Sequence, residues 1–278
     1  MVQTVQGFIS ETLSSSKQKN QDLTKYDLEL MACDLLKINR TELFSSSIYL
    51  ASNQRDEFSS MVKRRINGEP LAYILGTKDF WKINLQVDNS VLVPRPETEI
   101  IVEDILLNFH QKDLRVLDLG TGSGAIGLSL KQERKDWKVY CSDLSRNALS
   151  LAKKNSIKND LDIFLICSNW LNSFKHKCFD LIISNPPYIE EDNIALTSDG
   201  LKFEPKEALV SGITGKEDLY KIVSSARQYL RQGGYLYLEH APNQAKDLMI
   251  FIKHSRFKNS STIFDLNGDK RAIKAQSI

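Results

Sequence analysis

The segment Asn185-Pro186-Pro187-Tyr188, which directly follows the largely apolar run at 180–184, combines residue types that can bind a planar amide or amino group. The Asn185 side-chain oxygen and the backbone carbonyl of Pro186 provide two acceptors for the two N–H bonds of such a group. The prolines fix φ and remove competing N–H donors, while Tyr188 offers a flat face. The segment therefore predicts a site that aims a weakly nucleophilic amide nitrogen at an electrophile. An Asx-type turn before a proline loop is the structural alternative.

A second segment, the glycine-rich turn at 120–124, lies between an expected strand and an expected helix. Glycine lets the backbone turn sharply and approach a ligand closely, and the start of a helix offers unpaired N–H groups. In doubly wound sheets a turn of this kind is the usual place for a nucleotide-like cofactor. The candidate cofactor-binding residues here are Gly120, Thr121, Gly122, Ser123 and Gly124.

The glycine turn alone does not identify its cofactor. Gly122, Gly124 and Gly127 also satisfy G-x-G-x-x-G, and Asp143 follows at about the distance expected for a dinucleotide ribose, so an NAD-dependent dehydrogenase is an alternative. Asp118 beside the turn would repel a pyrophosphate but attract an ammonium, which S-adenosylmethionine carries. Asp143 could accept both ribose hydroxyls in either case, or cap the following helix. We therefore favour S-adenosylmethionine, whose sulfonium methyl group is a suitable electrophile.

Alternating strands and helices after about residue 112 must position these two segments. This rhythm predicts a mostly parallel sheet with helices on both faces, which is an α/β, Rossmann-like fold. The dipeptide Asn267-Gly268 predicts an antiparallel hairpin at the end of the sheet. The expected strands are 115–119, 138–143, 162–167, 180–184, 235–239, 261–266 and 271–274, and the expected helices are 125–131, 145–155 and 219–230.

The pattern of apolar residues divides the chain into three parts. Residues 1–76 predict a small all-α domain for substrate recognition. Residues 77–95 are rich in strand-forming residues interrupted at Asp88-Asn89, which predicts a β-hairpin linker. Residues 96–278 form the expected catalytic domain, with Pro96 at the first position of its first helix.

Composition excludes several classes of protein. The net charge of +2 is too small to predict direct nucleic-acid binding. Residues 1–16 lack the pattern of a secretory leader, and no stretch approaches the ~18 apolar residues of a membrane helix, so we expect no membrane partner and a cytoplasmic protein. Four scattered cysteines form no C-x-x-C pair, and we predict no metal site.

Taken in order, the motifs make the chain resemble the HemK/PrmC family of protein-(glutamine) methyltransferases over nearly its full length. That resemblance implies a helical N-terminal domain, a seven-stranded class I methyltransferase domain and S-adenosylmethionine as methyl donor. It implies peptide chain release factors as partners, methylated on the glutamine of their Gly-Gly-Gln loop. The motifs are Arg64-Arg65 to Glu69-Pro70, Phe80-Trp81, Pro94–Glu99, Gly120–Gly124, Asn185–Tyr188, Phe203-Glu204-Pro205, Ala208-Leu209, Glu239-His240 and Asp265–Arg271.

The resemblance also implies roles for individual residues. Gly120–Gly124, Asp143, Trp170 and Asn185 would line the cofactor pocket, with Trp170 covering the adenine unless it is an ordinary core aromatic. Asn185–Tyr188 would hold the glutamine, and Asn185, Pro186 and Tyr188 are the candidate catalytic residues. The chain departs from the common pattern at Asn169, where many members carry aspartate, which affects the expected cofactor affinity.

Three other functions remain open at this stage. Related enzymes methylate a glutamine of a ribosomal protein, but they differ at Pro94–Glu99. Asn-Pro-Pro-Tyr also serves methylation of an exocyclic amine in DNA or RNA, although the near-neutral charge argues against it. A non-catalytic docking module would not need both the glycine turn and Asn185.

Overall fold

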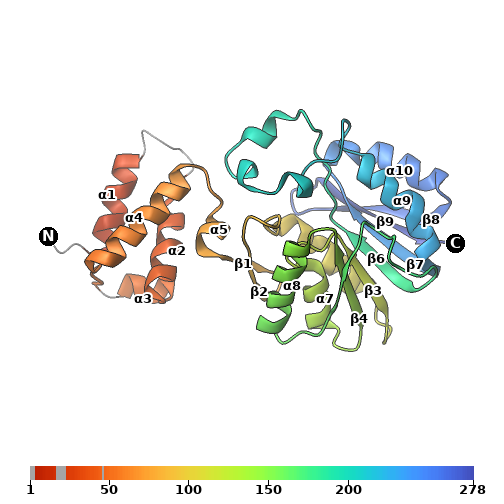
Figure 1. Ribbon diagram of the computed structural model, residues 1–278, viewed down its shortest axis with the longest axis horizontal. Coiled ribbons are helices and arrows are strands. Elements are labelled where there is room, and N and C mark those ends of the chain that lie inside the picture. The colour runs from red at the N-terminus through yellow and green to blue at the C-terminus, as the bar shows by residue number, and fades with distance from the viewer. Residues whose placement is uncertain (1–3, 17–22, 46) are drawn as a thin grey trace. The chain divides into compact units, whose positions relative to one another are not determined.

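The computed structural model describes residues 4–16, 23–45 and 47–278, and its contacts divide the chain into two compact units (Figure 1). One unit comprises residues 1–76 together with Thr197–Phe203. The other comprises Thr77–Leu196 and Glu204–Ile278. Each unit has its own hydrophobic core, and each is described by itself below.

The first unit is helical, as the sequence indicates. Thr24 and Asp27 form a reciprocal capping box at the start of α2. The longest of its described helices, α4, ends at Ile66, directly before Asn67. Leu28, Met31 and Phe58 are fully buried where these helices pack together. The helices are α1 Val5–Ser16, α2 Lys25–Leu36, α3 Arg40–Ser45, α4 Ser52–Ile66 and α5 Leu71–Leu75.

The β-hairpin lies earlier in the chain than the sequence predicts. Strands β1 Thr77–Phe80 and β2 Ile83–Gln86 pair around a turn at Trp81, whose φ is +54°, and not around Asp88-Asn89. Two later carboxylates hold this turn: Glu99 Oε1 accepts the Trp81 backbone N–H at 2.8 Å, and Glu133 Oε1 accepts the indole N–H at 2.7 Å. The Asp88 turn does form, but the chain after it is irregular.

A seven-stranded sheet forms the centre of the second unit, with strand order β5-β4-β3-β6-β7-β9-β8. The first five strands in this order are parallel, and β9 and β8 are antiparallel, which confirms the expected hairpin around Asn267-Gly268. The strands are β3 Arg115–Leu119, β4 Lys138–Asp143, β5 Phe164–Cys167, β6 Phe179–Ser184, β7 Leu230–Glu239, β8 Phe257–Phe264 and β9 Lys270–Ser277.

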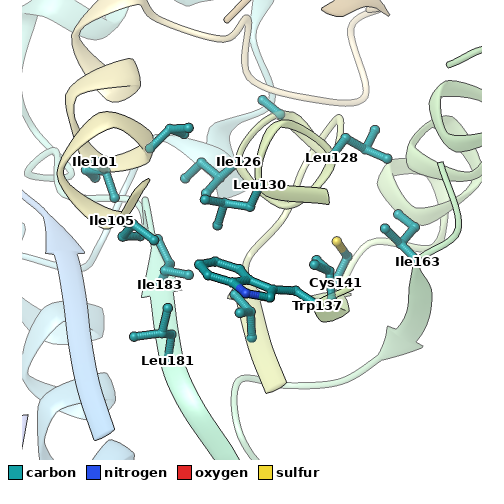
Figure 2. Packing of buried hydrophobic residues seen from close by; sticks show 14 of the residues in the cluster. Ile101, Ile105, Ile126, Leu128, Leu130, Trp137, Cys141, Ile163, Leu181 and Ile183 are labelled. Atoms are coloured by element: carbon teal, nitrogen blue, oxygen red, sulfur yellow. The ribbon is translucent and has the colours of Figure 1, made fainter. Parts of the chain in front are cut away.

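Helices cover both faces of this sheet because alternate strand residues point to opposite sides. In β6, Leu181 and Ile183 belong to the core under α6 and α7, whereas Ile182 belongs to the core under α9 and α10. Figure 2 shows the first of these cores around the fully buried Trp137. The helices are α6 Glu99–Asn108, α7 Ala125–Glu133, α8 Arg146–Lys158, α9 Glu217–Tyr229 and α10 Ala245–His254, and the short 3₁₀ helices are η1 Pro96–Thr98, η2 Ile194–Thr197, η3 Leu201–Phe203, η4 Lys206–Ala208 and η5 Pro242–Gln244.

The strand order creates a switch point between β3 and β6. From β3 the chain continues to β4 and β5 on one side, and then returns to β6 on the other side. In open α/β sheets, ligands bind outside the carboxyl ends of the strands at such a point. The glycine turn follows β3 and Asn185 follows β6, so the fold brings the two predicted segments together. Among the described helices, none has the length and apolar character needed to span a membrane.

Candidate active site

A cavity of about 550 Å³ lies at the carboxyl ends of β3, β4 and β6, within the size range of small-molecule sites. Most of the predicted site residues line it; Gly124 and Tyr188 do not. Among the residues that sequence reasoning missed, Thr98, Asp218 and Lys221 also line the cavity. The predicted lining residues are Gly120, Thr121, Gly122, Ser123, Asp143, Trp170, Asn185, Pro186 and Pro187.

The three glycines of the turn have different functions although all have positive φ. A Cβ added at Gly120 would lie 3.4 Å from the ring atom Cζ3 of Trp170, and a Cβ at Gly122 would point into open space. A Cβ at Gly124 would instead lie 2.9 Å from Cδ1 of Leu128. A Cβ at Gly120 would thus make only an ordinary contact with Trp170, and the positive φ is what favours glycine there, whereas Gly124 is also required for helix packing.

Asp143 ends β4 and connects the glycine turn to the next helix. Its Oδ2 accepts the N–H of Gly122 and its Oδ1 accepts the N–H of Ser145, both at 2.9 Å. Burial raises the pKa of Asp143, and these backbone donors oppose the shift. The cap of α8 is Ser145 itself, which accepts the N–H of Ala148, so capping is not the role of Asp143. Each carboxylate oxygen keeps a further acceptor site for a ribose hydroxyl.

Asp118 connects the glycine turn to α7 through hydrogen bonds, a role that the sequence did not suggest. Its Oδ2 accepts the Thr121 hydroxyl at 2.5 Å and the N–H of Gly127 at 2.9 Å. Burial raises the pKa of Asp118 to about 6, against the effect of these two donors. Because Asp118 also lines the cavity, attraction of a ligand ammonium remains compatible with this structural function.

The Trp170 ring is held in place from α9. Its indole N–H donates to Asp218 Oδ1 at 3.0 Å, and Asp218 Oδ2 accepts the Ser211 hydroxyl at 2.9 Å. Asn169, the position at which the chain departs from the family pattern, lies beside Trp170 and also lines the cavity. Its amide oxygen can accept a hydrogen bond but carries no charge.

Asn185 has one satisfied and one unsatisfied end. Its Nδ2 donates to Thr98 Oγ1 at 3.3 Å, whereas its Oδ1 is buried and has no hydrogen-bond partner among the described residues. Buried polar atoms are nearly always paired, so an exception inside a cavity indicates a ligand position. The side chain is thus oriented to accept an N–H bond from a bound group.

Tyr188 makes structural contacts that the sequence did not suggest. Its hydroxyl donates to Oε1 of Glu239 at 3.2 Å, and its carbonyl accepts the side chain of Gln244 at 2.9 Å. Burial raises the pKa of the Tyr188 hydroxyl, and the Glu239 charge adds to the shift. Tyr188 therefore anchors the loop to the end of β7. The face that it offers to a substrate stays a prediction.

A partly buried ion pair connects two segments that line the cavity. Nη2 of Arg95 lies 2.8 Å from both carboxylate oxygens of Glu204. Burial raises the pKa of Glu204, and the Arg95 guanidinium opposes this shift. The pair joins the loop before η1 to the segment at 205–208, part of which lines the cavity.

The sheet order, the glycine turn and the switch-point cavity define a class I methyltransferase that uses S-adenosylmethionine. In agreement, the chain matches the family model of the methyltransferase small domain over residues 97–201 and that of the PrmC N-terminal domain over residues 10–76. It is 38% identical over 271 residues to the release factor glutamine methyltransferase of Coxiella burnetii, covering 94% of this chain and 97% of that protein. The chain belongs to the release factor glutamine methyltransferase family, which confirms the resemblance noted from its motifs.

Two further comparisons agree with this assignment. The release factor glutamine methyltransferase of Shewanella oneidensis is 38% identical over 247 residues, covering 88% of this chain and 86% of that protein. A methyltransferase from Pyrococcus furiosus superposes with a TM-score of 0.55 at 17% identity, covering 82% of this chain and 100% of that one. The last comparison supports the fold alone.

The residues of the cavity fit S-adenosylmethionine. Gly120 leaves room for close approach beside the Trp170 ring, and Asp143 keeps acceptor sites for ribose hydroxyls. Asp118 supplies a carboxylate rather than the anion-binding residues that a pyrophosphate needs. When bound, S-adenosylmethionine supplies an electrophilic methyl group on a positively charged sulfur.

Proposed function

We propose that this protein methylates the side-chain amide nitrogen of the glutamine in the Gly-Gly-Gln loop of peptide chain release factors. The observation that carries the proposal is the buried, unpaired Oδ1 of Asn185 at the cofactor cavity. It is supported by the full-length similarity to proteins named release factor glutamine methyltransferase. A carboxamide donor is the group that this oxygen would recognise.

The mechanism that we propose depends on orientation. Asn185 Oδ1 accepts one N–H bond of the glutamine amide and the Pro186 carbonyl accepts the other, which points the nitrogen at the methyl group. S-adenosylmethionine would supply the methyl group: the N–C bond would form as the methyl–sulfur bond breaks, which leaves a neutral thioether, and the nitrogen would then release a proton to water. This proton leaves readily because a protonated amide is a strong acid, so no side chain is needed as a strong base.

Residues 1–76 are the proposed recognition unit for the release factor, and residues 77–95 the linker to the catalytic unit. This is supported by the match of residues 10–76 to the PrmC N-terminal domain. The net charge of +2 does not favour nucleic acid as a direct partner. We place the reaction in the cytoplasm, where translation termination takes place.

Mass spectrometry tests the proposal. The purified chain is incubated with a bacterial release factor and isotopically labelled S-adenosylmethionine, and the loop peptide is then fragmented. We expect a gain of one labelled methyl group on the loop glutamine, and none on a factor with alanine in its place. Transfer of label to ribosomal protein or to an oligonucleotide, with none to the factor, would instead support the corresponding alternative.

A further inference from the structure

A network of buried and partly buried polar side chains connects Asn185, at the cavity, to Thr98, Tyr188 and Glu239. Asn185 Nδ2 donates to Thr98 Oγ1 at 3.3 Å, and Thr98 is only 4% exposed. Glu239, at the carboxyl end of β7, is 1% exposed and accepts the Tyr188 hydroxyl at 3.2 Å. The Thr98 hydroxyl is near enough to lower the pKa of Glu239, although the two groups form no hydrogen bond of normal geometry. These residues come from three separate segments, the loop after β6, η1 and β7, so the fold alone brings them together.

The two ends of an asparagine amide have nearly the same shape, so hydrogen-bond partners decide which end points into the cavity. A carboxylate can only accept hydrogen bonds, whereas a threonine hydroxyl donates one and can accept another. The second oxygen of Glu239, Oε2, is buried without a partner of normal geometry among the described residues, so it favours donation from Thr98. Thr98 then accepts from Asn185 Nδ2, which leaves Oδ1 facing the cavity.

We propose that Thr98 and Glu239 are positioning residues that orient the Asn185 amide, so that the site accepts a carboxamide and rejects a carboxylate. This inference rests on the proposed function, because it explains how that site would distinguish glutamine from glutamate. If the side-chain amide of Asn185 were flipped, so that its oxygen and nitrogen exchanged places, Nδ2 would face the substrate. It would then favour a carboxylate oxygen instead.

The charge state of Glu239 controls the direction of this chain of hydrogen bonds. Burial raises the pKa of Glu239 to about 7; the nearby hydroxyls of Thr98 and Tyr188 and the charge of Arg271 oppose the shift, and Glu97 adds to it. The neighbouring His240 is buried, and burial lowers its pKa, which favours the neutral imidazole. Above pH 7 the ionised carboxylate can only accept. Below pH 7 the protonated carboxyl can donate to Thr98, and Asn185 is no longer held in one orientation.

The test measures discrimination directly. Isothermal titration with S-adenosylhomocysteine present compares a release factor carrying the loop glutamine with the same factor carrying glutamate. The variants are Thr98→Val, Thr98→Ser and Glu239→Gln. Thr262→Val in edge strand β8 and Glu103→Gln on the exposed side of α6 are the matched controls.

We expect Thr98→Val and Glu239→Gln to lower the glutamine-to-glutamate affinity ratio about tenfold, and Thr98→Ser and both controls to keep it within about twofold. The wild-type ratio should fall as the pH decreases through 7, and this dependence should disappear in Glu239→Gln. Thermal denaturation should stay close to that of the wild type for Thr98→Val and Thr98→Ser, which separates a loss of orientation from a loss of folding.

An unchanged ratio and an unchanged pH profile in folded Thr98→Val would overturn the inference. The Thr98→Val and Thr98→Ser pair decides the question even if Glu239→Gln does not fold. Because the ratio is a binding measurement, it is independent of turnover. Failure of the wild-type enzyme to methylate the glutamine would therefore overturn the proposed function, while the ratio would still test the positioning role.

Discussion

The two sides of the cavity differ in how their carboxylates and amides are paired. On the glycine-turn side, the carboxylates of Asp118 and Asp143 bind backbone N–H groups of the turn and of the following helices. On the Asn185 side, Oδ1 of Asn185, Oε2 of Glu239 and Nε2 of His240 are buried without hydrogen-bond partners among the described residues. A buried polar atom without a partner costs about 1–3 kcal/mol. Of these three atoms only Oδ1 of Asn185 belongs to a residue that lines the cavity, and on the glycine-turn side Oγ of Ser142 is likewise unpaired among the described residues. The loss of stability at Asn185 therefore falls where a ligand would bind.

The two sides therefore differ in whether the same contacts serve both function and stability. Substitutions on the glycine-turn side should weaken cofactor binding and folding together, because the same contacts serve both. Substitutions on the Asn185 side should reduce activity while leaving folding nearly unchanged. Three variants test this contrast.

Asn185→Ala should have the largest effect on activity. Removal of the acceptor leaves the glutamine amide unoriented, and we expect turnover to fall about 100-fold or more, as when one preorganised hydrogen-bonding group is removed from an active site. The free energy of unfolding should stay within about 1 kcal/mol of the wild type, because an unpaired buried oxygen is removed together with one long hydrogen bond. Single-turnover methylation and urea denaturation measure the two quantities.

Asn108→Ala, at the exposed carboxyl end of α6, is the matched control and should leave turnover unchanged. Full product formation by Asn185→Ala would contradict both the proposed mechanism and the contrast between the two sides.

Gly120→Ala should have the next largest effect, and it should act on both binding and stability. The φ of Gly120 is +74°, and a Cβ there would lie 3.4 Å from the Trp170 ring. We expect affinity for S-adenosylhomocysteine to fall about tenfold, and stability to fall by roughly 1–2 kcal/mol because alanine is strained at positive φ. Fluorescence titration and thermal denaturation would show whether the two losses occur together. A loss of stability with unchanged affinity would separate them and weaken the comparison.

Asp118→Asn should have the smallest effect on turnover and act mainly on the pH dependence of folding. Burial raises the folded pKa of Asp118 to about 6, above its value in the unfolded chain. The folded state therefore binds the proton more tightly, so this residue lowers stability as the pH rises from 4 to 6 and contributes a constant cost above that range. Relative to Asp118→Asn, the wild type should lose about 2 kcal/mol across this interval.

Urea denaturation at pH 4, 5, 6 and 7 measures this difference. Parallel curves of the free energy of unfolding against pH for the two proteins would mean that folding does not raise the pKa of Asp118.

Strands with strong local patterns were predicted closely. The expected bounds of β3 at 115–119 and of β4 at 138–143 are those observed, because each is a short, mostly apolar run bounded by turn residues. Bounds were less accurate where this signal is weak. For example, β7 begins at Leu230 rather than at 235, since Gly233 and Gly234 conceal its first half. The local pattern favours a hairpin turn at Asp88-Asn89, whereas the observed turn lies at Trp81. The local pattern does not reveal the Trp81 turn, because the carboxylates that hold it come from elements much later in the chain.

The sequence by itself determined the class of fold, the glycine turn, Asn185 and the family, because each depends on residues close together in the chain. Only the tertiary structure decided which end of Asn185 faces the cavity. That orientation depends on Thr98 and Glu239, which lie 87 and 54 positions away from Asn185 and reach it only when η1 and β7 pack beside β6. Hydrogen bonds between distant segments have no local sequence signature, since they form only after the chain has folded around them.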